Sequence, residues 1–182
     1  CGLLGTALDR LEAHEQKVDP DRAVPFITAL FDIGDELSKD QGDFFSISPD
    51  RRASRITRGY LKQVSDPGTR VKILKEAMET STALYFPILD ELAENNDLHV
   101  NDADLRELQQ VCVKKIKDAA GSGVLARHPR LLRILYCWKK WDSSEKPRQW
   151  VEQLISTEEG VLSFLTACRS RSLSFSTGDS AP

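Results

Sequence analysis

The chain has 182 residues, of which 40% are hydrophobic, 29% charged and 7% aromatic. This length is enough for one domain with a substantial core and too short for two large domains. The formal net charge of −3 excludes a uniformly basic nucleic-acid binder and a polyacidic tail. Ten Gly and eight Pro exclude a collagen-like repeat, and the longest apolar run, residues 84–89, is too short to cross a bilayer.

Apolar residues recur at the helical spacing of three and four from the start of the chain. The first half predicts five helices, and Ser48-Pro49 is a typical helix start, with a hydroxyl cap before a proline. Their expected positions are 3–11, ending before Pro20; 21–38; 49–64; 69–78; and 84–92, ending at Asn95-Asn96.

The second half predicts four more helices. Asn101 or Asp102 caps a long one that ends at Gly121, Pro129 begins the most apolar one, and Pro147 begins a short one. Ser156 and Glu159 have the spacing of a capping box before the last helix, which carries Val161, Leu162 and Leu165.

No stretch alternates with the period of a strand. We therefore expect an all-α fold, an irregular bundle of about eight or nine amphipathic helices without a sheet. Residues 1–168 form one helical domain in this interpretation, and residues 169–182 are a disordered, Ser-rich tail.

The four cysteines indicate a reducing compartment and no metal chemistry. They stand at positions 1, 112, 137 and 168, so no CxxC pair is available for zinc. Two of them fall in apolar helices, which predicts buried thiols in a cytoplasmic protein. The chain starts with Cys1 and helix-forming residues follow at once, so we interpret it as a fragment of a longer protein rather than a lipidated one.

Charge is strongly segregated along the chain. Residues 50–75 contain eight basic and two acidic residues, and residues 114–148 contain ten basic and three acidic residues. Between them, residues 76–107 contain nine acidic residues and Arg106. The candidate interaction face is the basic stripe on the third predicted helix and its end: Arg51, Arg52, Arg55, Arg58 and Lys62.

Three interpretations of this stripe remain open. The favoured one is a solvated face that pairs with an acidic helix of the same fold. Contact with another part of a parent protein is the second, and binding of nucleic acid phosphates is the third. An exposed aromatic residue beside the stripe would strengthen the third, but Tyr60 lies on the apolar side of the helix.

Other candidate sites have a simpler explanation. Asp32, Asp35 and Glu36 could ligate a hard cation, but none of His14, His99 and His128 has a helical spacing to them, so a solvated face is favoured. Trp138, Trp141 and Trp150 could clamp a cation or a base, but the spacing of the first two indicates core packing. His128, before Pro129, is expected to be a loop or capping residue.

The sequence contains no GxSxG, GxxxxGK[ST] or GxGxxG motif. We therefore expect no enzyme activity, no catalytic or metal-binding residue and no cofactor in this chain.

Three segments in order resemble the helical region that follows the ATPase core in KAP-family P-loop NTPases. They are residues 29–37 (ALFDIGDEL), residues 133–141 (RILYCWKKW), and residues 150–155 (WVEQLI) followed by residues 159–165 (EGVLSFL). The resemblance covers roughly residues 8–167.

The resemblance implies a parent ATPase whose Walker motifs lie upstream of Cys1, so ATP and Mg²⁺ are implied for the parent alone. It also implies that some parents are membrane-associated and that bacterial members are linked to phage exclusion. The expected function is a non-catalytic regulatory or recognition domain that docks onto the ATPase core, another subunit or a sensed ligand. The alternative is a nucleic-acid-contacting helical module that uses the basic stripe.

Overall fold

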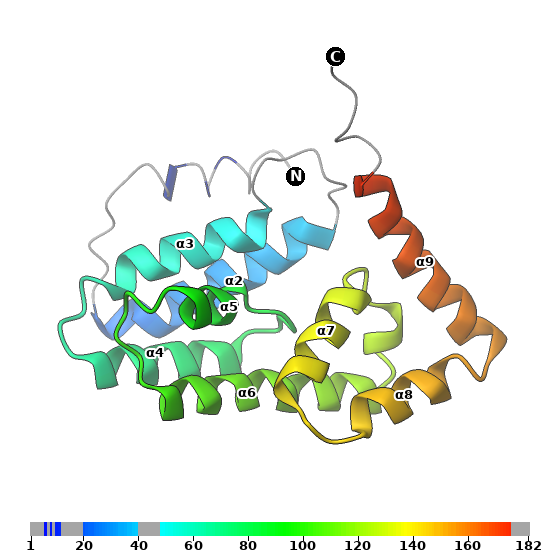
Figure 1. Cartoon of the computed structure of the whole chain (residues 1–182). Helices are drawn as coiled ribbons and strands as arrows, with labels where there is room; N and C mark the ends of the chain where they lie inside the picture. The colour runs from blue at the N-terminus through cyan, green and yellow to red at the C-terminus, as the bar shows by residue number, and fades with distance from the viewer. Residues whose placement is uncertain (1–5, 7, 9, 12–19, 40–47, 176–182) are drawn as a thin grey trace, which may run out of the picture. The chain divides into compact units, whose positions relative to one another are not determined.

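The computed structural model describes residues 6, 8, 10–11, 20–39 and 48–175, with side chains described as far as Cys168. These residues contain eight α-helices and no strand, which confirms the predicted all-α class (Figure 1). The elements are η1 Pro20–Arg22, α2 Ala23–Lys39, α3 Pro49–Leu61, α4 Pro67–Thr80, α5 Pro87–Glu94, α6 Asp102–Gly121, η2 Leu125–Arg127, α7 Leu131–Trp141, α8 Lys146–Leu154 and α9 Glu158–Phe175.

The chain divides into two compact units, where the sequence indicated one domain over residues 1–168. The first unit comprises Cys1–Gln41 and Phe45–Cys112, and the second comprises Gly42–Phe44 and Val113–Pro182. The division falls inside α6, so that helix contributes residues to both units.

Proline marks the starts of four helices, because its missing N–H is not needed in a first turn. Pro49, Pro67, Pro87 and Pro147 stand in the first turns of α3, α4, α5 and α8. The expected start of the fifth helix at residue 84 was wrong: α5 begins at Pro87. The residue before a proline is disfavoured in helical conformation, so residues 83–86 form a buried non-helical segment.

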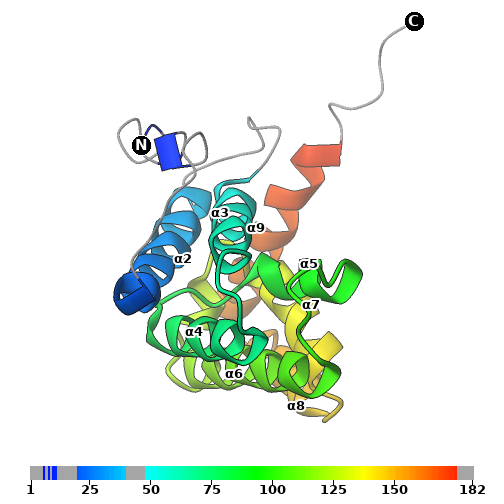
Figure 2. The same cartoon turned by 90° about the vertical axis from the view of Figure 1, so that its left-hand side faces the viewer.

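The core of the first unit depends on a close approach of α2 and α3, which lie side by side in Figures 1 and 2. A Cβ atom added at Gly34 of α2 would lie 2.9 Å from Ala53 Cβ and 3.1 Å from Asp50 Cα. Leu8 and Leu30 are almost fully buried in the same cluster as Ala53. Thr6, Leu8, Arg10 and Leu11 are helical, in agreement with the first predicted helix, whose other residues lie outside the described ones.

Aromatic contacts and a buried thiol complete this core. The Phe31 and Phe86 rings meet edge to face with centroids 5.1 Å apart, which joins α2 to the segment before α5. Cys112 is buried, as predicted, and its Sγ donates to the Leu84 carbonyl at 3.5 Å. Cys137 of the second unit is also buried. None of the described helices has the length and hydropathy required to cross a membrane.

Helix caps agree with the sequence at one position and differ at two others. Ser48 is the N-cap residue of α3, as predicted, but its side chain makes no capping hydrogen bond. Asn101 Oδ1 accepts from the Asp104 amide at 2.9 Å, which confirms the predicted cap of α6. The capping box of Ser156 and Glu159 was wrong. The Ser156 hydroxyl donates to the Gln153 carbonyl at 2.7 Å, and Thr157 Oγ1 accepts from the Gly160 amide at 3.1 Å.

α9 continues to Phe175, beyond the predicted boundary at residue 168. Each added helical residue forms one more backbone hydrogen bond, and serine is only mildly unfavourable in a helix. Residues 176–182 of the predicted tail lie outside the described residues.

The two helical glycines Gly34 and Gly59 give a matched test of the α2–α3 approach. We expect Gly34→Ala to destabilise the protein by about 1–3 kcal/mol, because the new methyl group comes too close to Ala53 Cβ (2.9 Å) and Asp50 Cα (3.1 Å) of α3. Gly59→Ala should raise stability by up to about 1 kcal/mol, because nothing lies within 4 Å of the added Cβ and alanine favours the helix. Urea unfolding of both variants measures the difference, and equal effects would contradict the close approach.

Candidate functional site

The basic stripe lies on α3 and its C-terminal end, and part of it is used inside the first unit. Arg58 donates to Glu91 Oε2 at 3.0 Å and to Asp97 Oδ2 at 2.7 Å, and Lys62 Nζ lies 2.6 Å from the same Asp97 oxygen. Both carboxylates come from the acidic stretch, so these contacts agree with the favoured interpretation. Arg51 and Arg55 are exposed, and Arg52 is half-buried.

This ion-pair cluster shifts the pKa values of its members. The hydrogen bond to Asp97, with that to Glu91, raises the pKa of Arg58 above its ordinary value. Burial alone would raise the pKa of Asp97, but the hydrogen bonds from Arg58 and Lys62 outweigh it and hold this pKa below its ordinary value. Two of the five cations, Arg58 and Lys62, therefore contribute to the structure of the first unit through ion pairs with Asp97.

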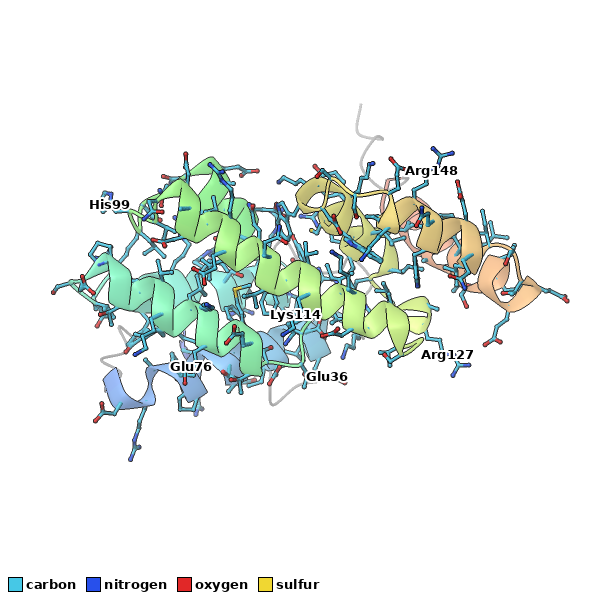
Figure 3. All side chains as sticks on the ribbon, turned by 90° about the horizontal axis from the view of Figure 1, so that it is seen from below. Glu36, Glu76, His99, Lys114, Arg127 and Arg148 are labelled. Carbon is cyan, nitrogen blue, oxygen red and sulfur yellow. The ribbon has the colours of Figure 1, made fainter. Side chains whose placement is uncertain are left out.

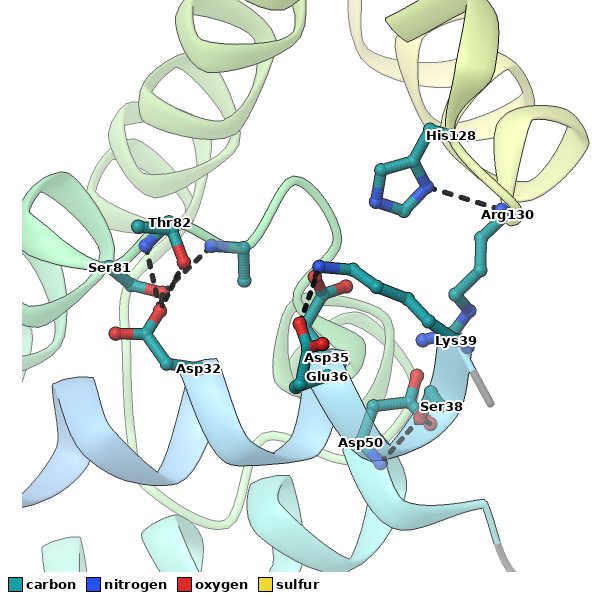
Figure 4. A network of polar contacts seen from close by, with 11 residues as sticks. Asp32, Asp35, Glu36, Ser38, Lys39, Asp50, Ser81, Thr82, His128 and Arg130 are labelled. Carbon is teal, nitrogen blue, oxygen red and sulfur yellow. Dashed lines mark hydrogen bonds and ion pairs between the residues drawn. The ribbon is translucent and has the colours of Figure 1, made fainter. Parts of the chain in front are cut away.

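The three carboxylates of α2 make structural contacts within the chain, and Asp35 is buried rather than on the expected solvated face (Figure 4). Asp32 Oδ1 accepts from the Ser81 hydroxyl and the Thr82 amide, both at 2.7 Å, and so ties α2 to the segment after α4. Lys39 Nζ lies 3.2 Å from Asp35 and 2.9 Å from Glu36. In the described part of the chain, no three His, Cys, Asp or Glu side chains are arranged to hold a metal ion.

The described histidines occupy connections between helices. His128 lies in the connection between η2 and α7, where its Nδ1 accepts from the Arg130 amide at 3.1 Å, in agreement with the predicted loop or capping residue. His99 stands between α5 and α6 with a left-handed φ of 56°. His14 lies outside the described residues.

A pocket of about 570 Å³ opens in the second unit, between the end of α6, α7 and α8. Trp138 of α7 is buried, as predicted, and its ring centroid lies 6.1 Å from that of Trp150 on α8. Apart from Leu154, the remaining lining consists of small, cationic and amide residues: Lys117, Ala120, Gly121, Gly123, Ala126, Lys146, Gln149 and Gln153.

Asp142 organises this pocket, and the sequence reading missed it. Its carboxylate lies 2.8 Å from Lys117 Nζ, accepts from Trp138 Nε1 at 3.1 Å, and accepts from the Ser144 amide at 3.1 Å. It thereby joins α6, α7 and the loop before α8. The Asp-x-Ser spacing of an Asx turn was the available signal, but it could not reveal Lys117.

The same contacts make Asp142 strongly acidic. The hydrogen bond from Lys117 is the largest cause, and those from Ser144 and Trp138 add to it, so the pKa of Asp142 lies far below its ordinary value. A carboxylate at a helix C-terminus is unfavourable toward the helix dipole, and Lys117 offsets this cost.

We expect Asp142→Asn to destabilise the protein by about 1–3 kcal/mol at pH 6, because charge-assisted hydrogen bonds to a partly buried carboxylate are lost. A lowered folded-state pKa gives stability that is present above the unfolded-state value near 4 and is lost as the pH falls below it. The difference between wild type and variant should therefore shrink from pH 5 to pH 2. Urea titrations at several pH values measure it, with Asp118→Asn on the exposed side of α6 as control. A pH-independent difference would contradict the role of the charge.

Exposed apolar side chains gather in the second unit. Among the described residues, the large hydrophobic side chains that are exposed are Val124, Tyr136, Ile155, Val161, Leu162 and Leu165, and all six belong to this unit. Figure 3 shows charged side chains of the same unit, including Lys114, Arg127 and Arg148. Arg127 and Arg148 are paired with Glu159 and Glu152 in exposed ion pairs.

Comparison with known proteins adds no relative to this picture: no family model, no curated protein and no solved structure matches the chain.

Proposed function

We propose that this chain is a non-catalytic recognition domain that docks onto another protein through the outer side of α9. In line with the resemblance described above, the proposed partner is the P-loop ATPase portion of a KAP-type protein, which would hold ATP and Mg²⁺. The observation that carries the docking proposal is the exposure of Leu162 (59%), Leu165 (57%) and Val161 (37%) on one helix.

These three residues share one face. Positions i, i+1 and i+4 of a helix fall within an arc of about 100°, so Val161, Leu162 and Leu165 form one apolar row. Adjacent apolar side chains left in water are typical of protein interaction sites, whereas single exposed ones are ordinary. Glu158, exposed in the first turn of α9, adds a polar edge to the row.

The inner side of α9 is fixed to the second unit, which leaves the row in a defined position. α9 contacts η2 and α7, and Gly160 is buried at the turn from α8. A Cβ at Gly160 would overlap the carbonyl oxygen of Leu154, so the two helices meet without room for a side chain. A preformed helix that exposes an apolar row in this way suits insertion into an apolar groove of a partner.

The test is capture of the purified ATPase portion by the immobilised chain, over 50 to 500 mM salt. We expect capture that changes little with salt, because burial of apolar surface is not screened. The double variant Leu162→Asp/Leu165→Asp should weaken it at least a hundredfold, since each buried leucine contributes about 1.5–3 kcal/mol. Its melting temperature should stay close to that of wild type.

Lys114→Asp, an exposed substitution on α6 of the same unit, is the control and should leave capture unchanged. Capture that survives the leucine substitutions would contradict docking through α9. ATP hydrolysis by the chain alone would contradict the non-catalytic part of the proposal.

A further inference from the structure

The solvent side of α7 combines an exposed aromatic ring with cations. Leu131, Ile134, Cys137 and Trp138 face the interior of the second unit. On the other side Tyr136 is 59% exposed, and Lys139 and Lys140 are exposed at the next turn. We call these three residues the Tyr136 face.

The ring and the charges of this face are close to one another. Lys140 Nζ lies 6.0 Å from the centroid of the Tyr136 ring and 5.9 Å from that of Trp141. These are the distances of weak cation–π contacts. Positions three and four residues apart lie on adjacent turns of one helix side, so one extended ligand can touch the ring and both lysines together.

The electrostatic surroundings favour an anionic ligand. α7 contains no acidic residue, and Asp142, which follows it, already contacts Lys117. The second unit has 12 basic and 8 acidic residues, while the first has 13 basic and 20 acidic. Segregation of this kind produces a positive potential where the cations gather.

The exposed tyrosine favours a ligand that has a planar group as well as a negative charge, and inorganic phosphate has no planar group. Its ring offers a flat apolar surface on which a planar group can stack, and lysines beside it neutralise charge at a distance of about one helical turn. Nucleotides in a single strand present both features, a free base face and a phosphate. In a duplex the base faces are already stacked.

We propose that the Tyr136 face binds single-stranded nucleic acid without sequence preference. Tyr136 stacks against one base, and Lys139 and Lys140 contact the phosphates on either side of it. This site differs from the basic stripe on α3, where Tyr60 is 4% exposed and packs edge to face on Phe26, and where Arg58 and Lys62 are engaged in ion pairs.

The experiment measures binding of the full chain to a fluorescently labelled 20-nucleotide poly(dT) strand by anisotropy, over 25 to 200 mM salt. Tyr136→Ala should weaken binding about tenfold, the effect of one lost base–aromatic stack. Tyr136→Phe should restore most of it, because the phenyl ring still stacks. Lys139→Glu/Lys140→Glu should abolish binding, because both phosphate contacts are lost. In the wild type these two contacts should contribute about −1.4 to the log–log salt slope on a single strand.

Arg51→Glu/Arg55→Glu on α3 is the matched control, with the same change of charge, and should leave Tyr136-dependent binding in place. Binding that is lost in this control and kept in the α7 variants would overturn the proposal and assign the contact to α3. The same follows if Tyr136→Ala binds the strand as tightly as wild type.

Two other probes separate the remaining possibilities. Duplex DNA should bind more weakly than the single strand, and equal binding would overturn the stacking role of Tyr136. Vesicles with 30% phosphatidylserine should not compete with the strand. Binding to these vesicles without binding to the strand would overturn the proposal in favour of a membrane surface. These results are independent of Leu162 and Leu165, so failure here leaves docking through α9 unaffected.

Discussion

The carboxylate of Asp142 fixes the orientation of the helix on which the surface of the second unit depends. Because it accepts from Trp138 Nε1 and contacts Lys117 Nζ, one side of α7 is held toward α6. A helix with a fixed inner side has a fixed outer side. The exposure of Tyr136 and the position of Trp138 in the lining of the pocket are thus two results of one anchoring contact.

The sequence predicted the fold class and most helices, because the apolar period and the helix-start prolines are local signals. Gly34 lies on the buried side of α2, and the structure shows why a larger residue does not fit there. The errors were also local. The segment before Pro87 is buried as a helix would be, but it is not helical. Hydrophobicity alone does not distinguish a buried helix from a buried irregular segment.

The candidate sites were less predictable, because they depend on partners far apart in the chain. The sequence pattern of a basic stripe is the same whether the stripe faces solvent or acidic neighbours. Only the structure shows that Asp97 lies beside Arg58 and Lys62. Lys117 of α6 and Asp142, which follows α7, are likewise brought together only by the fold. The exposure of the apolar residues on α9 could not be predicted from the sequence for a related reason. The last helix has apolar residues around much of its circumference, and a one-dimensional pattern does not tell which of them neighbouring helices cover.

The glycine at the turn from α8 to α9 has a mechanical consequence. No side chain separates Gly160 from the Leu154 carbonyl, and Thr157 caps α9. The connection between α8 and α9 is therefore tightly packed. Trp150 lies one turn before Leu154 on α8, and its ring meets Trp138. A tilt of α9 would therefore also move α8, and with it Trp150. The opening of the pocket that Trp138 and Trp150 line would change as a result.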